Sequence, residues 1–162
     1  MTDAVVPEID YRLTGVGWSA CTVRFGDAHC EVSASYLSDA LGKLVLGAAA
    51  IVSGAHAVSV GFDEEPGEFR WAIVRESAQT VRVTVLSFPK LWANRPDAEG
   101  EAMLTFACDA DDFGAAVWLA ATRVRNAWPG EAYREQWLEH DFPTNALALL
   151  EIALGDAAPS AR

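Results

Sequence analysis

The chain has 162 residues, of which 51% are hydrophobic and 22% charged, a composition typical of one globular domain and not of a disordered chain. It carries 23 acidic and 12 basic residues. The resulting formal net charge of −11 opposes binding to nucleic acid and to anionic membrane surfaces. The same charge favours a protein partner with a basic surface.

The sequence also predicts a compartment and a domain organisation. An odd count of three cysteines and an N-terminus without a secretion signal predict reduced thiols in the cytoplasm. The most apolar stretch, residues 41–52, is too short to span a bilayer. Residues 1–9 and 156–162 lack periodicity and are expected to be flexible tails around a single domain, residues 10–155.

Three antiparallel strands are expected first, at residues 10–16, 18–25 and 28–33. Gly26-Asp27 is typical of a two-residue hairpin turn, which pairs Phe25 with Ala28. In that register one apolar face carries Cys21, Val23, Phe25, Ala28, Cys30 and Val32. The other, solvated face carries Thr22, Arg24, His29 and Glu31.

A helix is predicted next, over residues 36–53, with Ser35 as its N-cap. Four more strands follow, at residues 56–63, 68–75, 80–88 and 101–108. Pro66-Gly67 indicates a tight turn between the first two of these strands. Three helices end the chain, at about residues 109–128, 133–137 and 143–154, with Asp109 or Asp111 capping the first.

This order, βββα ββββ ααα, predicts the α+β class. We expect a mainly antiparallel meander sheet of about seven strands with the helices packed on one face. The other face would lie in water, and the alternation assigns to it Arg24, Glu31, Glu68, Arg70, Arg82 and Thr84.

Catalytic and metal-binding motifs are not recognisable in the sequence. His29 and Cys30 are adjacent in a predicted strand and point to opposite faces, so they cannot bind one ion together. The alternation places all three cysteines on apolar faces, where a thiol is inert. We therefore predict no metal, no cofactor and no catalytic residue, which favours a protein that is not an enzyme.

Two features indicate a surface for a protein partner. Acidic residues crowd the turn around residues 63–68, which is either merely solvated or a contact for a basic partner. Trp92 lies in a long polar connection, where an aromatic ring either anchors a partner or covers the edge of the core. The residues predicted to bind a partner are Glu64, Glu65, Glu68, Arg70, Arg82 and Trp92.

Two other functions remain as hypotheses. A curved sheet covered by helices can hold a small-molecule pocket, which Phe69 and Trp71 would line. Alternatively the chain self-associates as a homodimer, with Trp118 or the outer sheet face at the interface.

The segment EEPGEFRW at residues 64–71, followed by YREQW at residues 133–137 and by Phe142-Pro143, resembles an uncharacterised bacterial protein family. The resemblance covers about residues 11–154. That family has no established activity, so the resemblance transfers no catalytic residue. In size, acidity and lack of motifs the chain is also similar to immunity proteins, which neutralise bacterial toxins.

Overall fold

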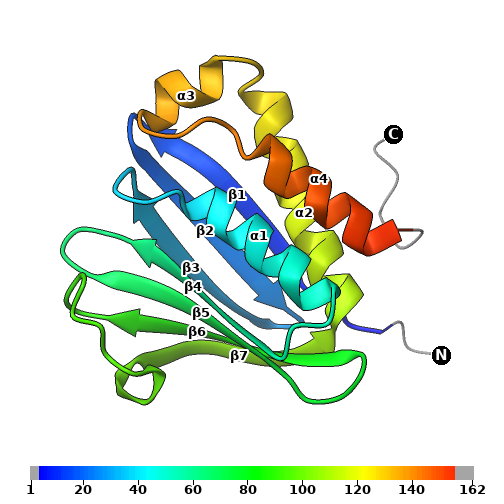
Figure 1. Cartoon of the computed structure of the whole chain (residues 1–162). Coiled ribbons are helices and arrows are strands. Elements are labelled where there is room, and N and C mark those ends of the chain that lie inside the picture. The colour runs from blue at the N-terminus through cyan, green and yellow to red at the C-terminus, as the bar shows by residue number, and fades with distance from the viewer. Residues whose placement is uncertain (1–3, 156–162) are drawn as a thin grey trace.

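The computed structural model describes residues 4–155 and confirms the α+β class (Figure 1). The predicted C-terminal tail, residues 156–162, and the first three residues of the N-terminal tail lie outside the described residues. The strands are β1 (Glu8–Gly15), β2 (Trp18–Phe25), β3 (Ala28–Ser35), β4 (Ala57–Asp63), β5 (Glu68–Arg75), β6 (Thr80–Phe88) and β7 (Glu101–Asp109). The helices are α1 (Ala40–Val52), η1 (Asp97–Glu99, a 3-10 turn), α2 (Ala110–Ala127), α3 (Ala132–Trp137) and α4 (Thr144–Leu154).

The seven strands form two antiparallel sheets, where the sequence predicted one. Sheet A has the order β1-β2-β3 and sheet B the order β4-β5-β6-β7. The chain crosses from β3 to β4 through α1, so these two strands touch without joining their hydrogen-bond ladders. A short hairpin turn would have continued the meander, and the helical crossover interrupts it.

The predicted register of the β2–β3 hairpin is confirmed. Phe25 pairs with Ala28, and Arg24 lies opposite His29. The middle of its apolar face is buried, with Val23 and Val32 at 0% and 1% exposed, whereas Phe25 is partly exposed and Ala28 is exposed beside the turn. β1 begins at Glu8, two residues earlier than predicted, and its Ile9 is buried in the same core.

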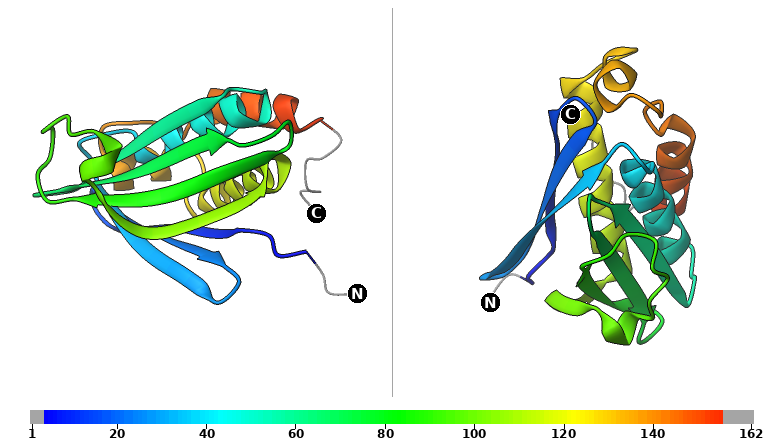
Figure 2. Two further views of the ribbon diagram at one scale, coloured as in Figure 1. Left: turned by 90° about the horizontal axis from the view of Figure 1, so that it is seen from below. Right: turned by 90° about the vertical axis from the view of Figure 1, so that its left-hand side faces the viewer.

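Aromatic rings join the two sheets and the helices. Tyr11 of sheet A meets the ring of Phe62 of sheet B edge-on, with centroids 6.2 Å apart. Phe62 contacts Trp71 at 5.8 Å, and Trp71 contacts Phe113 of α2 at 6.3 Å. Figure 2 shows the two sheets inclined to each other with α2 beside both, and α2 contacts β1 and β7. The inner faces of both sheets therefore share one core.

The start of α1 differs from the prediction. The helix begins at Ala40 and not at residue 36, and its N-cap is Asp39, whose Oδ1 accepts a hydrogen bond from Gly42 N at 3.1 Å. Ser35 instead extends β3, and its hydroxyl donates to the carbonyl oxygen of Asp63 at 3.2 Å. Both residue types cap helices well, and the contact with sheet B is what commits Ser35 to the strand. For α2 the predicted cap Asp109 is confirmed.

The three longer helices form a layer of their own, in which α1 lies against α4, α2 and strand β4. Close approach to β4 depends on Gly47, where a Cβ atom would lie 2.8 Å from Cγ2 of Val60. None of the helices within residues 4–155 combines the length and the apolar character needed to cross a membrane.

We predict that Gly47→Leu lowers the free energy of unfolding by about 1–3 kcal/mol, because the larger side chain overpacks the contact with Val60. This loss should appear although leucine favours a helix by roughly 1 kcal/mol over glycine. Urea unfolding followed by tryptophan fluorescence measures it. Leu46→Ala is the control, since Leu46 is 52% exposed and should change stability little. Wild-type stability for Gly47→Leu would show that α1 does not lie this close to β4.

Candidate functional site

Trp92 is the most exposed of the six tryptophans, at 70%. It lies in the connection from β6 to β7, and its indole Nε1 donates a hydrogen bond to Oδ2 of Asp63 at 3.3 Å. The backbone N–H of Leu91 donates to the carbonyl oxygen of Pro66 at 2.8 Å. These two contacts hold Trp92 beside the turn between β4 and β5, with its ring in solvent.

That turn carries three carboxylates, on Asp63, Glu64 and Glu65. The backbone of Asp63 is fixed by Ser38, whose hydroxyl accepts a hydrogen bond from Asp63 N at 3.5 Å, and Glu64 N donates to Gly67 O at 3.0 Å. None of the three carboxylates forms an ion pair with another residue in the range 4–155. We call Asp63, Glu64, Glu65 and Trp92 the Trp92 patch.

Gly67 allows this turn to lie against the end of β6. A Cβ atom at Gly67 would lie 2.5 Å from the carbonyl oxygen of Phe88, a contact that a larger residue could not make. The glycine therefore brings the carboxylates close to the residues that follow β6, where Trp92 lies.

Glu68 and Arg70, which were predicted to bind a partner, are engaged within the protein. The guanidinium of Arg70 pairs with Oε1 of Glu68 at 3.1 Å and with Oδ1 of Asp97 at 2.9 Å, and it donates to the carbonyl oxygen of Arg95 at 2.7 Å. It also lies 4.1 Å from the centroid of the Phe88 ring. The side chain of Arg70 is only 11% exposed, so it acts as a clamp that holds residues 89–100 on the outer face of sheet B.

The sequence left open whether the Trp92 side chain covers the edge of the core or faces outward. Residues 89–100 do cover part of sheet B, since Gly100 packs close to the ring of Phe88. The ring of Trp92 itself does not take part in this cover. The connection therefore both closes the sheet face and presents an aromatic side chain.

We predict that Arg70→Met speeds tryptic cleavage after Lys90 by about tenfold or more, because hydrogen bonds to a charged group contribute roughly 1.5–3 kcal/mol. Lys90 is exposed, and Pro96 protects the peptide bond after Arg95. Mass spectrometry of timed digests measures the rate. The matched control is Arg82→Met, which removes another arginine of sheet B without touching the clamp. Equal cleavage rates for the two variants would show that Arg70 does not restrain the loop.

Arg82 lies away from the Trp92 patch. The register pairs Arg82 with Val74 near one end of β5 and Glu68 with Phe88 at the other end. Arg82 is exposed and forms an ion pair with Glu76 at 2.8 Å. Among the six predicted residues, the structure therefore brings together Glu64, Glu65 and Trp92.

The two predicted pocket residues belong to the core. Trp71 is 0% exposed between the rings of Phe62 and Phe113, and Phe69 is partly buried against the same core. Trp118, considered for a dimer interface, is also buried, and its Nε1 donates to Oε1 of Glu151 on α4 at 2.8 Å.

The cysteines are buried and unpaired, as predicted. Burial raises the pKa of the Cys30 thiol to about 11. Burial, together with Asp112 and Asp109, raises the pKa of the Cys108 thiol to about 12. Burial also raises the pKa of Cys21, further still. Within residues 4–155 no group of three or more His, Cys, Asp and Glu side chains is arranged to hold a metal ion.

We predict that none of the three thiols reacts with a disulfide reagent at pH 8 within minutes in the native protein. A pKa raised to about 11 leaves only about one thiol in a thousand ionised at that pH, and the thiolate is the reactive form. All three should react after unfolding in guanidinium chloride, as followed by the absorbance of the released thiol. Rapid labelling of the folded protein would contradict the burial of these side chains.

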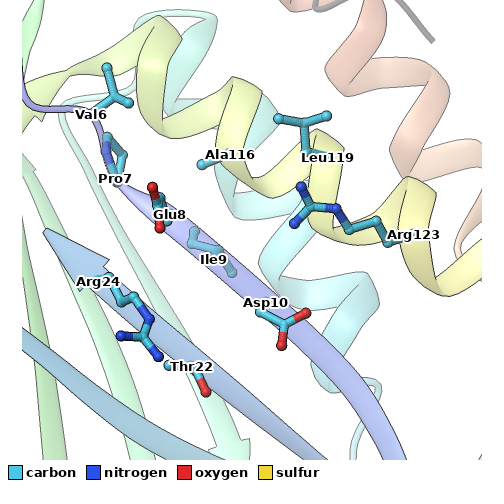
Figure 3. A pocket seen from close by; sticks show the side chains of 10 residues that line it. All are labelled: Val6, Pro7, Glu8, Ile9, Asp10, Thr22, Arg24, Ala116, Leu119 and Arg123. Carbon is cyan, nitrogen blue, oxygen red and sulfur yellow. The ribbon is translucent and has the colours of Figure 1, made fainter. Parts of the chain in front are cut away.

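A second feature is a cleft of about 400 Å³ between β1 and α2 (Figure 3). β1 and the residues before it form its middle, β2 borders it on one side and α2 on the other. The apolar lining consists of Val6, Pro7, Ile9, Ala116 and Leu119. The polar lining consists of Glu8, Asp10, Thr22, Arg24 and Arg123. No sequence pattern predicted this cleft, because its walls come from segments about a hundred residues apart.

Comparison with known proteins adds no relative. No protein-family model matches the chain, no curated protein matches it, and no solved structure matches its fold.

Proposed function

We propose that this protein is a non-enzymatic interaction domain that binds a basic partner protein through the Trp92 patch. The observation that carries the proposal is a tryptophan side chain, 70% exposed, hydrogen-bonded to one of three carboxylates that have no ion-pair partner among the described residues. An exposed tryptophan that is already held in place is a good interface anchor, since little side-chain freedom is lost on binding.

The chemistry of the patch fits lysine or arginine side chains. The face of an indole ring attracts a cation, and neighbouring carboxylates can pair with the same group. Both effects strengthen when the partner excludes water. What supports a role for Glu64 and Glu65 is that they lie between Asp63 and Pro66, which both contact the loop that carries Trp92.

The charge of the whole chain supports the same partner. A net charge of −11 attracts a basic protein over several ångströms and speeds encounter, an effect that salt weakens. Neutralisation of a basic toxin, as in an immunity or antitoxin role, is one form that this function would take.

The buried thiols also favour binding over catalysis. A cysteine nucleophile needs an exposed, polar setting that lowers its pKa, and here burial raises the pKa of Cys30 and Cys108.

The test is capture of partners from lysate of the source cells by four forms of the protein: wild type, Trp92→Ala, the double variant Glu64→Lys/Glu65→Lys, and the control Glu135→Lys/Glu139→Lys. We expect one stoichiometric partner with wild type and the control. Trp92→Ala should weaken its binding by about 30-fold or more, the cost of losing a hot-spot tryptophan. Charge reversal on the patch should slow association most at low salt.

The control carries the same change of charge on exposed residues at and after α3. It therefore separates loss of the patch from loss of net charge. A partner that binds Trp92→Ala as tightly as wild type would refute the role of the patch, and capture of no partner would refute the proposed function.

A further inference from the structure

The cleft between β1 and α2 combines an apolar lining with charged groups of both signs. Ile9 and Ala116 form buried parts of its lining, at 3% and 6% exposed. Val6 and Leu119 remain 47% and 36% exposed, so a molecule in the cleft would cover apolar surface that now faces water.

The arginines of the cleft have no ionic partner. Arg24 on β2 and Arg123 on α2 form no ion pair with any residue between Ala4 and Gly155. In Figure 3 the side chain of Arg123 extends from α2 towards β1. In a chain with almost twice as many acidic as basic residues, an arginine that borders a cleft without an ion-pair partner among the described residues, as Arg123 does, is well placed to bind a carboxylate.

The acidic side chains of the cleft differ from each other. Asp10 pairs with Arg12 at 2.5 Å. Glu8 has no ion-pair partner among the described residues, although it lies opposite Arg24 in the register of β1 and β2. Glu8 is thus the carboxylate that can accept hydrogen bonds from an ammonium group.

We propose that this cleft binds a small zwitterion with an apolar body, such as an apolar dipeptide with free termini. Arg123 would bind its carboxylate, Glu8 its ammonium group, and Val6 and Leu119 its apolar side chains. The carboxylates of Glu8 and Asp10 would repel a ligand that carries only negative charge. The guanidinium groups of Arg24 and Arg123 would repel a ligand that carries only positive charge. A volume of about 400 Å³ lies within the usual range of small-ligand pockets.

This site shares no residue with the Trp92 patch, so the two proposals stand or fall separately.

The experiment is titration of the ¹⁵N-labelled protein with Leu-Leu dipeptide, N-acetyl-Leu-Leu and Leu-Leu amide, followed by amide chemical shifts. Leu-Leu should shift the amides of β1 and of the middle of α2. Each blocked form should bind at least tenfold more weakly, because one charged contact is lost. Absence of shifts with Leu-Leu at millimolar concentration, or equal binding of all three compounds, would overturn the proposal.

Three variants assign the contacts. Glu8→Gln should weaken Leu-Leu at least tenfold but leave N-acetyl-Leu-Leu unchanged, since that compound has no ammonium group to lose. Arg123→Gln should weaken Leu-Leu similarly and leave Leu-Leu amide unchanged. Arg125→Gln, an exposed arginine of α2 outside the cleft, should bind like wild type. Native-like spectra of the free variants confirm folding, and uniform weakening of every compound by Glu8→Gln would contradict the assigned role of Glu8.

Discussion

The architecture depends on four aromatic side chains, each in contact with the next: Tyr11, Phe62, Trp71 and Phe113. Each comes from a different element, so the line of rings joins sheet A, strands β4 and β5 of sheet B, and α2. Within residues 4–155 no hydrogen-bond ladder links the two sheets, and side-chain packing therefore determines how they are inclined. A second contact between the sheets lies at the end of β2. There the ring of Phe25 stacks on that of Phe106 of β7, with centroids 4.8 Å apart, and this contact also constrains the angle between the sheets. Large rings with defined contact geometry suit this role, because they bury much area and prefer few arrangements.

The Trp92 patch follows from this core through sheet B. Phe62 and Trp71 point inward on β4 and β5, so alternation directs Asp63 and Arg70 away from the core. Asp63 then meets the indole of Trp92, and Arg70 holds the same connection at Arg95 and Asp97. The Trp92 patch is thus positioned by strands whose opposite faces hold the two sheets together.

Much of the fold could be predicted from local patterns, and the failures have identifiable causes. The β2–β3 register was predictable because alternation and the Gly26-Asp27 turn impose the same pairing. The division into two sheets was not, because periodicity assigns faces but does not say whether β3 and β4 share a ladder after a helical crossover. The start of α1 was misplaced because Ser35 and Asp39 are both good caps, and only the contact between Ser35 and Asp63 decides between them.

Individual residues of the candidate site could be predicted from the sequence, but the way in which they lie together could not. Composition singled out Glu64, Glu65 and Trp92, yet their proximity rests on a hydrogen bond between Asp63 and Trp92, which are 29 positions apart. Alternation placed Arg70 on an outer face correctly, but it could not show that residues 89–100 fold over that face. No local sequence pattern predicts the cleft between β1 and α2, because the segments that form its walls have the ordinary pattern of amphipathic strands and helices.

The way residues 89–100 are attached has an evolutionary consequence. This connection is held at two points. The hydrogen bond between Leu91 and Pro66 lies before its exposed tip, residues 92–94, and the contacts of Arg70 with Arg95 and Asp97 lie after it. Between these points the exposed residues are Trp92, Ala93 and Asn94. Mutations at these three positions leave the contacts of Leu91 and Arg70 and the core intact, so their cost in stability is confined to the hydrogen bond of Trp92 to Asp63 and to the left-handed backbone of Trp92 and Asn94. Under the proposed function, sequence change at this tip alone would therefore alter what the protein recognises, on an otherwise unchanged scaffold.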